Sequence, residues 1–276
     1  MPAEPFSRFD QAVTVRRLGP GRYAAAVDPG WSGPVAPNGG VLAATMIRAA
    51  QAELGPGAPP LRSISAHYLA APAAGAIELQ VEPLRVGKRV TFVDVRMRQH
   101  DQLVAQATII GSTERPTDTA MASEPPLVPA FDEVAAIEGS VVPGEPPIFD
   151  RLEMRPVFGA GIFSGASEAV TGGWLAFRDD AAPLDAARLC ALTDLWWPAV
   201  FTARTSLVGI PTLQLTVHLR STRTEVHWPV LARYESRNAL EGHVDESGEV
   251  WSADGRLLAE SRQLALLLPF PRELGG

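Results

Sequence analysis

Asp194 is a carboxylate in the middle of a stretch that is apolar enough to be buried. Residues 184–201 (LDAARLCALTDLWWPAVF) predict a long helix that is apolar on nearly every side. Burying an ionised carboxylate is costly unless the group is hydrogen-bonded or paired. Asp194 is therefore either a satisfied structural group or a functional one, and burial would raise its pKa toward values that suit a general base.

A second candidate site is the helix start at Asn38, Gly39 and Gly40. These residues lead directly into VLAATMIRAAQAEL (41–54), a helical pattern for which Asn38 is a suitable N-cap. Backbone N–H groups at such a start can receive an oxyanion or a phosphate. A glycine pair is also an ordinary way to enter a helix tightly, so both interpretations stay open.

Three further residues invite a chemical role but are better explained by structure. His67 and His218 lie on strand patterns whose neighbours alternate between apolar and polar, which indicates satisfied histidines on half-buried strands. Cys190 is the only cysteine, which excludes a disulfide framework and any multi-cysteine metal site. We expect it to pack in the core.

The length, charge and apolar content of the chain limit the class of protein. Its 276 residues suffice for one large domain or two smaller ones, and we expect two. A net charge of -7 leaves no broad basic face, so we expect no nucleic-acid partner. The sequence has no apolar run long enough for a membrane span and no charged-then-apolar signal at its N-terminus. We expect a cytoplasmic protein.

The elements that must position these residues occur twice. Two short strands (13–28) and the helix after Asn38 precede β-type runs at 61–70, 76–99 and 102–111. Residues 113–148 then shift to Pro, Glu, Ser and Thr and predict a linker. After it, strands at 150–157 and 172–178 precede the helix 184–203 and further β-type runs at 212–220, 229–255 and 256–268.

Local sequence similarity supports a duplication. Laying 64–69 over 215–220 superposes His67 on His218, and 103–106 falls on 257–260, at offsets of 151 to 154. A period of this length indicates duplication of a whole domain. We therefore predict an α+β fold, a double hot-dog of two tandem repeats, each with an antiparallel sheet wrapped around a long central helix. The predicted parts are an N-terminal hot-dog (1–112), a Pro-rich linker (113–148) and a C-terminal hot-dog (149–276); an unrelated tandem of α+β domains is the alternative.

Several motifs resemble one branch of this fold. PNGGVLA (37–43), SISAHYL (63–69) and EPLRVGK (82–88) in the first half, and LTDLWW (192–197), IPTLQLTVH (210–218) and AESRQLA (259–265) in the second, resemble acyl-CoA thioesterase II and the thioesterase-like hot-dog superfamily. The resemblance covers nearly the whole chain apart from the linker and both ends. It implies hydrolysis of acyl-CoA thioesters without a metal or organic cofactor, and a homo-oligomer of two or more copies.

The resemblance also implies a catalytic group. In that family an Asp on the second helix, a Thr or Ser that opens the next strand and a Gln on the last strand orient a water that attacks the thioester carbonyl. Residue by residue, these correspond to Asp194, Thr212 and Gln263. Thr212 and Gln263 can each accept from a water and donate to a carboxylate, so the trio can hold a nucleophile in one orientation.

Substrate contacts are expected at four further residues besides Asn38, Gly39 and Gly40. Trp196 and Trp197 either pack in the core or narrow an acyl pocket. Arg85 and Lys88, beside Arg89 at a turn near Gly87, are the candidates for contacting the phosphates of coenzyme A, although an ordinary solvated turn explains them as well.

Two other functions remain open on the same pattern. A non-catalytic module that binds acyl-CoA or an acyl lipid would keep the pocket without turnover. Hydratase or dehydratase chemistry on enoyl thioesters is also known on this fold, but the Asp-plus-His signature of the hydratase branch is not found in the sequence. A fold by itself does not specify a reaction.

Overall fold

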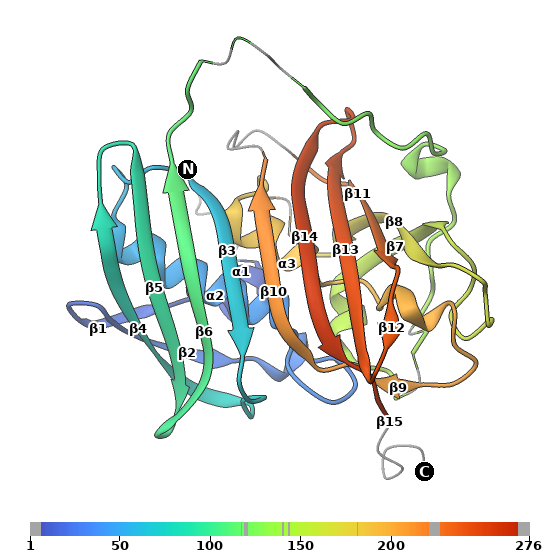
Figure 1. The fold of residues 1–276 in the computed structure, drawn as a ribbon, viewed down its shortest axis with the longest axis horizontal. Coiled ribbons are helices and arrows are strands. Elements are labelled where there is room, and N and C mark those ends of the chain that lie inside the picture. Colours follow the sequence, from blue (N-terminus) through green and yellow to red (C-terminus); the bar gives the residue numbers. More distant parts are fainter. Residues whose placement is uncertain are drawn as a thin grey trace.

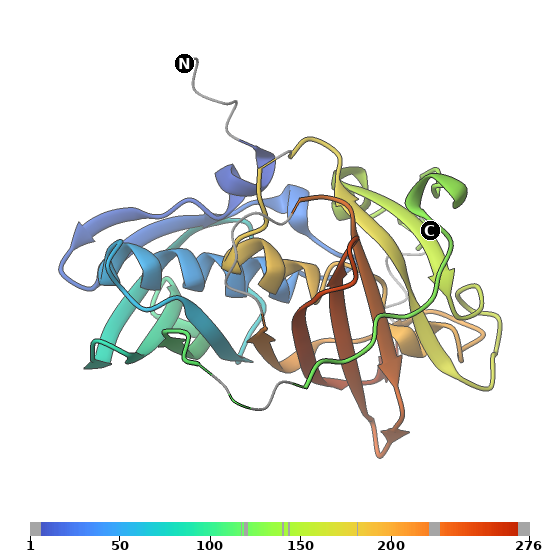
Figure 2. The same ribbon diagram turned by 90° about the horizontal axis from the view of Figure 1, so that it is seen from above.

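One large antiparallel sheet dominates the computed structural model, with its main helices on one face (Figures 1 and 2). The structure describes residues 7–269 apart from 117, 119, 120, 140, 143, 181 and 221–226. Within these residues the main sheet has thirteen strands, and a separate two-stranded sheet pairs β9 (Val208–Gly209) with β15 (Leu268–Pro269). The expected antiparallel sheets with few helices are thus present.

The first half of the chain supplies six strands of the main sheet and two helices. A short helix, α1 (Arg8–Ala12), precedes β1 (Arg16–Gly19), β2 (Arg22–Val27), α2 (Gly39–Leu54), β3 (Leu61–Tyr68), β4 (Gly75–Val86), β5 (Val90–Gln99) and β6 (Gln102–Ser112). Asn38 caps α2, as expected: its side chain accepts the N–H of Val41 at 3.0 Å.

The second half follows the same sequence of elements with a much shorter helix. It contains β7 (Leu152–Phe158), β8 (Ala169–Phe177), α3 (Ala186–Leu192), β10 (Thr212–Leu219), β11 (Val230–Ser236), β12 (Ala239–Leu240), β13 (His243–Ser252) and β14 (Leu257–Leu266). The expected strand regions of both halves are occupied by strands.

The strand order is symmetric about the junction between the halves. The order β1-β2-β4-β5-β6-β3 is followed by β10-β14-β13-β11-β8-β7, so that β3 and β10 meet edge to edge at the centre. There the hydroxyls of Ser65 and Thr216 lie 3.0 Å apart, and these two residues are separated by the repeat offset of 151. Joining the halves in this way leaves neither central strand with an unpaired edge.

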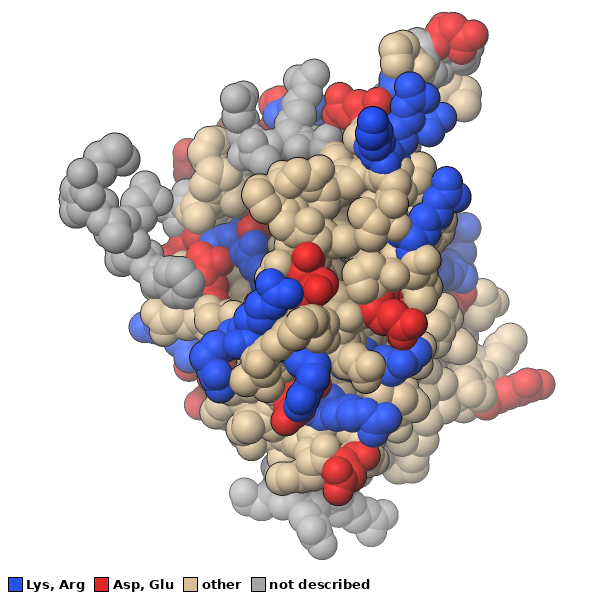
Figure 3. All heavy atoms as spheres, turned by 90° about the vertical axis from the view of Figure 1, so that its left-hand side faces the viewer, with Lys and Arg blue, Asp and Glu red and all other residues tan. Residues whose placement is uncertain are grey.

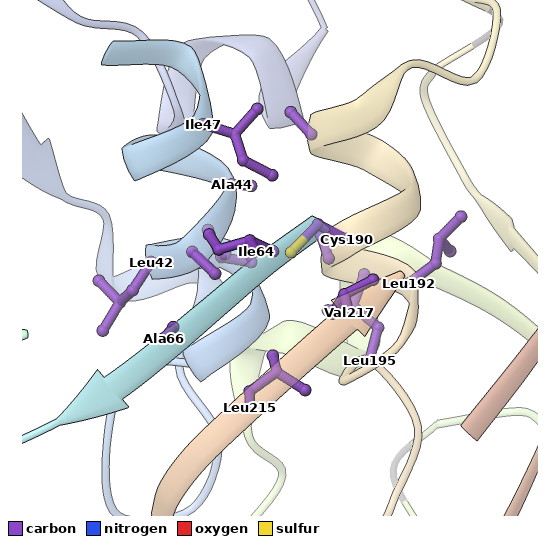
Figure 4. Close-up of a cluster of buried hydrophobic side chains, with 14 of the residues drawn as sticks. Leu42, Ala44, Ile47, Ile64, Ala66, Cys190, Leu192, Leu195, Leu215 and Val217 are labelled. Atoms are coloured by element: carbon purple, nitrogen blue, oxygen red, sulfur yellow. The ribbon is translucent and has the colours of Figure 1, made fainter. Parts of the chain in front are cut away.

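The main core lies between the helices and the inner face of the central strands. Figure 4 shows this cluster, with Ile64 from β3 beside Cys190 of α3, Leu215 from β10 beside Leu195, and Leu42 from α2 on the other side. Alternate residues of each strand enter this core because successive strand side chains point to opposite faces. The expectation that Cys190 packs in the core is confirmed.

The predicted long helix over 184–203 is wrong. Helix α3 has only seven residues, and the chain then turns, with a short 3₁₀ helix at Ala199–Phe201. Pro198 disfavours helical geometry at the residue before it. In addition, the Thr193 hydroxyl donates to the carbonyl of Cys190 at 2.7 Å, which satisfies a carbonyl that a longer helix would have used. Asp194 consequently lies in the turn after α3 rather than inside a helix.

A cluster of ion pairs centred on the buried Arg188 joins α1, α2 and the start of α3. The guanidinium of Arg188 in α3 lies 2.7 Å from Asp10 in α1, 2.7 Å from Asp180 and 3.2 Å from Asp185. Arg48 in α2 bridges Asp10 and Asp185 at 3.0 and 2.8 Å. Its two ion pairs bring α2 into the same cluster as α1 and α3.

Residues 128–134 of the predicted linker pack on the outer face of the sheet, whereas Val142 and Ile148 are buried in the main core. Phe131 meets Trp174 edge to face at 6.4 Å, and the indole of Trp174 donates to the carbonyl of Pro129 at 2.9 Å. Arg155 donates to the carbonyls of Phe131 and Val134. Five positions in the predicted linker, 117, 119, 120, 140 and 143, lie outside the described residues. These contacts cover Trp174, Leu231 and Trp251, which form a second small apolar cluster.

Candidate active site

The Asp194 side chain lies where the end of α3 meets the start of α2. Its own N–H donates to the carbonyl of Ala191 at 2.9 Å, and its carbonyl accepts from Asn38 Nδ2 at 2.6 Å. The hydroxyl of Tyr234 on β11 donates to the carbonyl of Leu192 just before it. These contacts fix the backbone of the turn and direct the Asp194 carboxylate toward α2.

The carboxylate itself is held by two N–H donors. Asp194 Oδ2 accepts from the backbone N–H of Gly40 at 2.8 Å, and Oδ1 accepts from Gln263 Nε2 on β14 at 2.6 Å. Thr212 at the start of β10 donates its hydroxyl to Gln263 Oε1 at 3.1 Å. The structure thus brings together Asp194, Thr212 and Gln263, which are far apart in sequence.

Gly39 and Gly40 allow the close approach of the two helices. A Cβ at Gly40 would lie 2.8 Å from Asp194 Cβ and 2.9 Å from the carbonyl oxygen of Ala191. A Cβ at Gly39 would lie 3.2 Å from Asp194 Oδ2 and from the hydroxyl of Tyr68. The Gly40 N–H, offered from the sequence as a receptor for an oxyanion, is directed at Asp194 instead. The positive end of the α2 dipole therefore stabilises the carboxylate of the chain itself.

Burial raises the pKa of Asp194 to about 6, from an ordinary value of 3.8, although the hydrogen bonds from Gly40 and Gln263 oppose the shift. Among the described residues, no Lys, Arg or His forms an ion pair with this carboxylate. Asp194 is therefore an ionisable base near neutral pH whose charge is stabilised by dipoles alone.

A mostly apolar cavity of about 350 Å³ opens at this carboxylate, within the size range of small-molecule sites. Its wall includes Asn38, Gly39, Thr212 and Gln263 together with the apolar side chains of Leu42, Trp196, Trp197, Phe201, Val208 and Ile210. The rings of Trp196 and Trp197 lie 4.7 Å apart, and the Trp196 indole donates to Thr171 at 2.9 Å. Both tryptophans are packed in the core and also lie in the cavity wall, so their contact with an acyl chain stays a prediction.

Comparison with known sequence families identifies the chain. The acyl-CoA thioesterase C-terminal domain matches residues 119–267, and the acyl-CoA thioesterase N-terminal domain matches residues 27–111. The chain belongs to the acyl-CoA thioesterase family. No curated protein matches it significantly.

Solved structures extend this result. A hot-dog protein of unknown function from Alicyclobacillus acidocaldarius is 26% identical, with a TM-score of 0.85 over 94% of this thioesterase-family chain and 97% of that chain. A candidate thioesterase II from Thermobifida fusca is 28% identical, with a TM-score of 0.81 over 94% and 98%. TesB2, an acyl-CoA thioesterase II from Mycobacterium marinum, shares the fold at 18% identity, with a TM-score of 0.74 over 95% and 99%.

Tyr68 is a residue of the candidate site that the sequence analysis missed. Its hydroxyl donates to the carbonyl of Gly39 at 2.6 Å. Burial, with the charge of Asp194 adding to it, raises the pKa of Tyr68 well above its usual range, so the hydroxyl stays protonated. Strand alternation could have revealed it, because Tyr68 follows the apolar Ile64 and Ala66 at alternate positions of the same strand.

Glu246 on β13 is a second missed residue. Val244, Gly248 and Val250 are all buried at alternate positions of this strand, so Glu246 belongs to the same inward face. It lines the cavity and accepts the N–H of Ala199 at 2.6 Å. A carboxylate at an inward position of an otherwise buried strand is a signal that the sequence does contain.

Arg85 and Lys88 do not reach the cavity of this thioesterase-family chain. Both are exposed near the turn between β4 and β5, and neither lines the cavity. Tyr68 marks the position of the site, and strand pairing across the sheet places it level with Leu79 on β4. Arg85 is six residues farther along β4, which is roughly 20 Å from Leu79. On this side of the molecule Lys and Arg are mixed with Asp and Glu (Figure 3). The structure gives the expected phosphate contact no support within one chain, and the role stays a prediction.

The two histidines lie outside the site as well. His67 and His218 are exposed on the outer face of the sheet, on the central strands β3 and β10. Both strands are half-buried, as expected, and strand alternation turns these two side chains to the exposed face, away from the core. Neither residue lines the cavity.

No group of three or more His, Cys, Asp or Glu side chains in the described ranges is placed to hold a metal ion. No helix in the part of the chain that the structure describes is both long and apolar enough to cross a membrane.

Proposed function

We propose that the protein hydrolyses acyl-CoA thioesters to the free acid and coenzyme A, with Asp194 as the general base. The observation that carries the proposal is a carboxylate with no cationic partner among the described residues, placed at the start of α2 and in the wall of an apolar cavity. Its pKa near 6 leaves it ionised at neutral pH while keeping it basic enough to take a proton. Membership of the acyl-CoA thioesterase family supports the same substrate class.

The reaction needs a water held beside the carboxylate. Asp194 removes one proton as the water oxygen forms a bond to the thioester carbon, and the carbonyl electrons move onto oxygen. When this tetrahedral intermediate collapses, the C–S bond breaks, and the proton on Asp194 passes to the sulfur of the leaving coenzyme A. Gln263 and Thr212 act by positioning: the amide of Gln263 fixes Asp194 Oδ1, and the hydroxyl of Thr212 fixes the amide.

Asn38 and Gly39 are proposed to border the thioester, and Trp196 and Trp197 to contact the acyl chain, since all four line the cavity next to Asp194. The positive end of α2 favours negative charge at this position, so it would also stabilise the oxyanion.

We further propose that the chain is a double hot-dog, with units 1–112 and 149–276 joined by residues 113–148. The matching strand order of the two halves and the contact between Ser65 and Thr216 at their junction support this proposal. A single complete catalytic group per chain agrees with the divergence of the halves, because the start of α3 lacks the glycine pair of α2. The homo-oligomer stays a prediction.

Release of free thiol from short-, medium- and long-chain acyl-CoA esters tests the function. Substituting Asp194→Asn keeps the size of the side chain and removes the base. We expect kcat to fall by roughly 10²- to 10⁴-fold, the range for loss of a general base. Asp101→Asn is the matched control, because Asp101 is an exposed carboxylate in the turn between β5 and β6. Full activity in Asp194→Asn would remove Asp194 from the mechanism.

A folded protein that cleaves none of the esters would contradict the hydrolase proposal. Equilibrium binding of the same acyl-CoA series would then decide whether the cavity serves a non-catalytic binding module.

A further inference from the structure

Beyond Gln263, the cavity wall carries polar side chains that the proposed reaction does not use. Glu246 on β13 is the register partner of Gln263 on β14. On the far side of β13, Glu235 pairs with Ser247, so Ser236, the next residue of β11, stands opposite Glu246. Ser236, Glu246 and Gln263 all line the cavity and form a row that leads away from Asp194.

The row contains hydrogen-bonding groups that the protein itself leaves unused. The Ser236 hydroxyl is buried without a hydrogen-bond partner among the described residues, and so is the indole N–H of Trp197 in the same cavity wall. Leaving a buried polar group unpaired costs on the order of 1–3 kcal/mol. Glu246 uses Oε2 to accept from Ala199, and within the described residues its Oε1 has no donor.

Glu246 can donate a hydrogen bond at neutral pH. Burial raises its pKa to about 8; the charges of Asp194 and Asp245 add to the shift, and the N–H of Ala199 opposes it. Because Oε2 already accepts from Ala199, the proton belongs on Oε1. Ser236 can donate or accept, and Trp197 can only donate.

This wall is suited to the acyl part of a substrate rather than to coenzyme A. None of the described residues that line the cavity is a Lys or Arg that could pair with phosphates. The side chains around the polar row, such as Val200 and Val244, are apolar. An unsubstituted acyl chain would cover Ser236 and Trp197 without satisfying them.

We propose that the cavity selects acyl thioesters whose chain carries a hydroxyl or keto oxygen, bound by Glu246, Ser236 and Trp197. The inference rests on the proposed thioesterase function and specifies its substrate class. Neighbouring strands are about 4.8 Å apart, so Glu246 lies roughly 5 Å and Ser236 roughly 10 Å from Gln263. The recognised oxygen is therefore in the middle or outer part of the chain, several carbons beyond the thioester carbon.

The test compares octanoyl-CoA with octanoyl-CoA esters that carry a hydroxyl or a keto group in mid-chain or near the end of the chain. For the native protein, we expect kcat/KM to favour at least one oxygenated ester by about three- to ten-fold, the gain from one hydrogen bond. Equal values of kcat/KM for the plain and all oxygenated esters would overturn the inference.

Variants assign the preference to the polar row. In Ser236→Ala and Glu246→Leu, the ratio of oxygenated to plain kcat/KM should fall toward one. Glu246→Gln should keep the ratio, because an amide can still accept from Ala199 and donate into the cavity. Ser247→Ala is the matched control, since Ser247 is on the outer face, where its hydroxyl accepts from Arg262. An unchanged ratio in both Ser236→Ala and Glu246→Leu would overturn the assignment.

Binding separates this inference from the proposed function. Calorimetric titration of the same esters into the Asp194→Asn protein measures the preference without turnover. Preferential binding of an oxygenated ester, in a protein whose native form cleaves none of them, would refute the hydrolase and retain the inference. Hydrolysis by the native protein, together with equal binding of all esters, would support the hydrolase and refute the inference.

Discussion

The two ends of α3 each hold a buried charge, and the groups around these charges differ. At the start of the helix, Arg188 is 3% exposed and contacts three carboxylates, from Asp10, Asp180 and Asp185. Just after its end, Asp194 meets only neutral donors, the N–H of Gly40 and the amide of Gln263. The first charge is neutralised by opposite charges, whereas the second is solvated by dipoles.

The difference has a direct effect on protonation. Burial lowers the pKa of Arg188, but the hydrogen bond with Asp10 and the charges of Asp185 and Asp180 raise it by more, so this group stays charged. The dipoles around Asp194 do not offset its burial, and its pKa stays raised at about 6. A neutralised charge can stabilise the helix contacts, while a charge held by dipoles remains available to take a proton.

The largest effect on stability is expected at the first cluster. Arg188→Met removes the cation and leaves the Asp180 side chain, 1% exposed, without its partner. We expect the free energy of unfolding to fall by about 3–5 kcal/mol, as for other broken buried ion pairs, while kcat per folded molecule is kept. Urea unfolding followed by tryptophan fluorescence measures the change.

Arg8→Met is the control for that experiment. Arg8 pairs with Asp179 at 2.9 Å, but its side chain is 56% exposed. An exposed pair of this kind contributes at most about 1 kcal/mol. A loss in Arg188→Met no larger than the loss in Arg8→Met would show that the buried cluster is not a stabilising feature.

At Asp194 the comparison predicts stability that falls as pH rises. Its pKa is 3.8 ordinarily and about 6 in the folded protein, so between these values the folded state holds a proton that the unfolded chain has lost. Asp194 should therefore lower the free energy of unfolding through this window by at most about 3 kcal/mol, a decrease separate from that of Glu246, whose pKa is raised to about 8. Asp194→Asn cannot titrate and should lack this decrease, so it gains stability relative to the native protein above pH 6.

Urea titrations of the native protein and of Asp194→Asn across this pH window measure the difference in their free energies of unfolding. Asp101→Asn should follow the native curve. Parallel curves for the native protein and Asp194→Asn would mean that Asp194 titrates alike in the folded and unfolded states, and the contrast with Arg188 would be lost.

The smallest effect expected is on the pH dependence of the rate. Gln263→Met removes an N–H donor that favours the ionised carboxylate, so the pKa of Asp194 should rise above 6. The acidic limb of kcat/KM, which needs ionised Asp194, should move to higher pH by roughly one to two units. Stopped assays of thiol release across the pH range measure the limb.

Thr212→Val provides the graded comparison. Thr212 contacts the amide of Gln263 rather than the carboxylate, so its loss should move the limb less than Gln263→Met does. If both variants lowered the rate without shifting the acidic limb of kcat/KM, Gln263 would support packing only.

Much of the fold could be predicted from the sequence because local patterns determine it. The β-type runs located β3, β6, β10 and β14 within a few residues and enclosed β4 with β5, and β11 to β13, in two longer runs. Asn38 marked the start of α2. The length of α3 could not be read in this way. Residues 193–201 are as apolar as a buried helix, but they form a turn and the cavity wall, because Pro198 and the contacts of Asp194 with α2 end the helix at Leu192.

The candidate site was only partly open to such reasoning. A carboxylate in an apolar stretch singled out Asp194, and the resemblance in the later motifs added Thr212 and Gln263. Glu246 and Tyr68 escaped notice, although the alternation of their strands directs both of them inward. Arg188 escaped as well, since its three partners come from α1 and from the segment that leads into α3.

By itself, therefore, the sequence determined which segments form strands, where α2 begins and which carboxylate is out of place in its surroundings. These are properties of neighbours along the chain, recorded in periodicity and caps. Only the tertiary structure decided that the start of α2 faces Asp194, that a polar row continues from Gln263 to Ser236, and that Arg188 rather than Asp194 is neutralised by opposite charges. Each of those contacts joins residues far apart in sequence, and its strength depends on burial and distance, which exist only once the sheet and helices have packed.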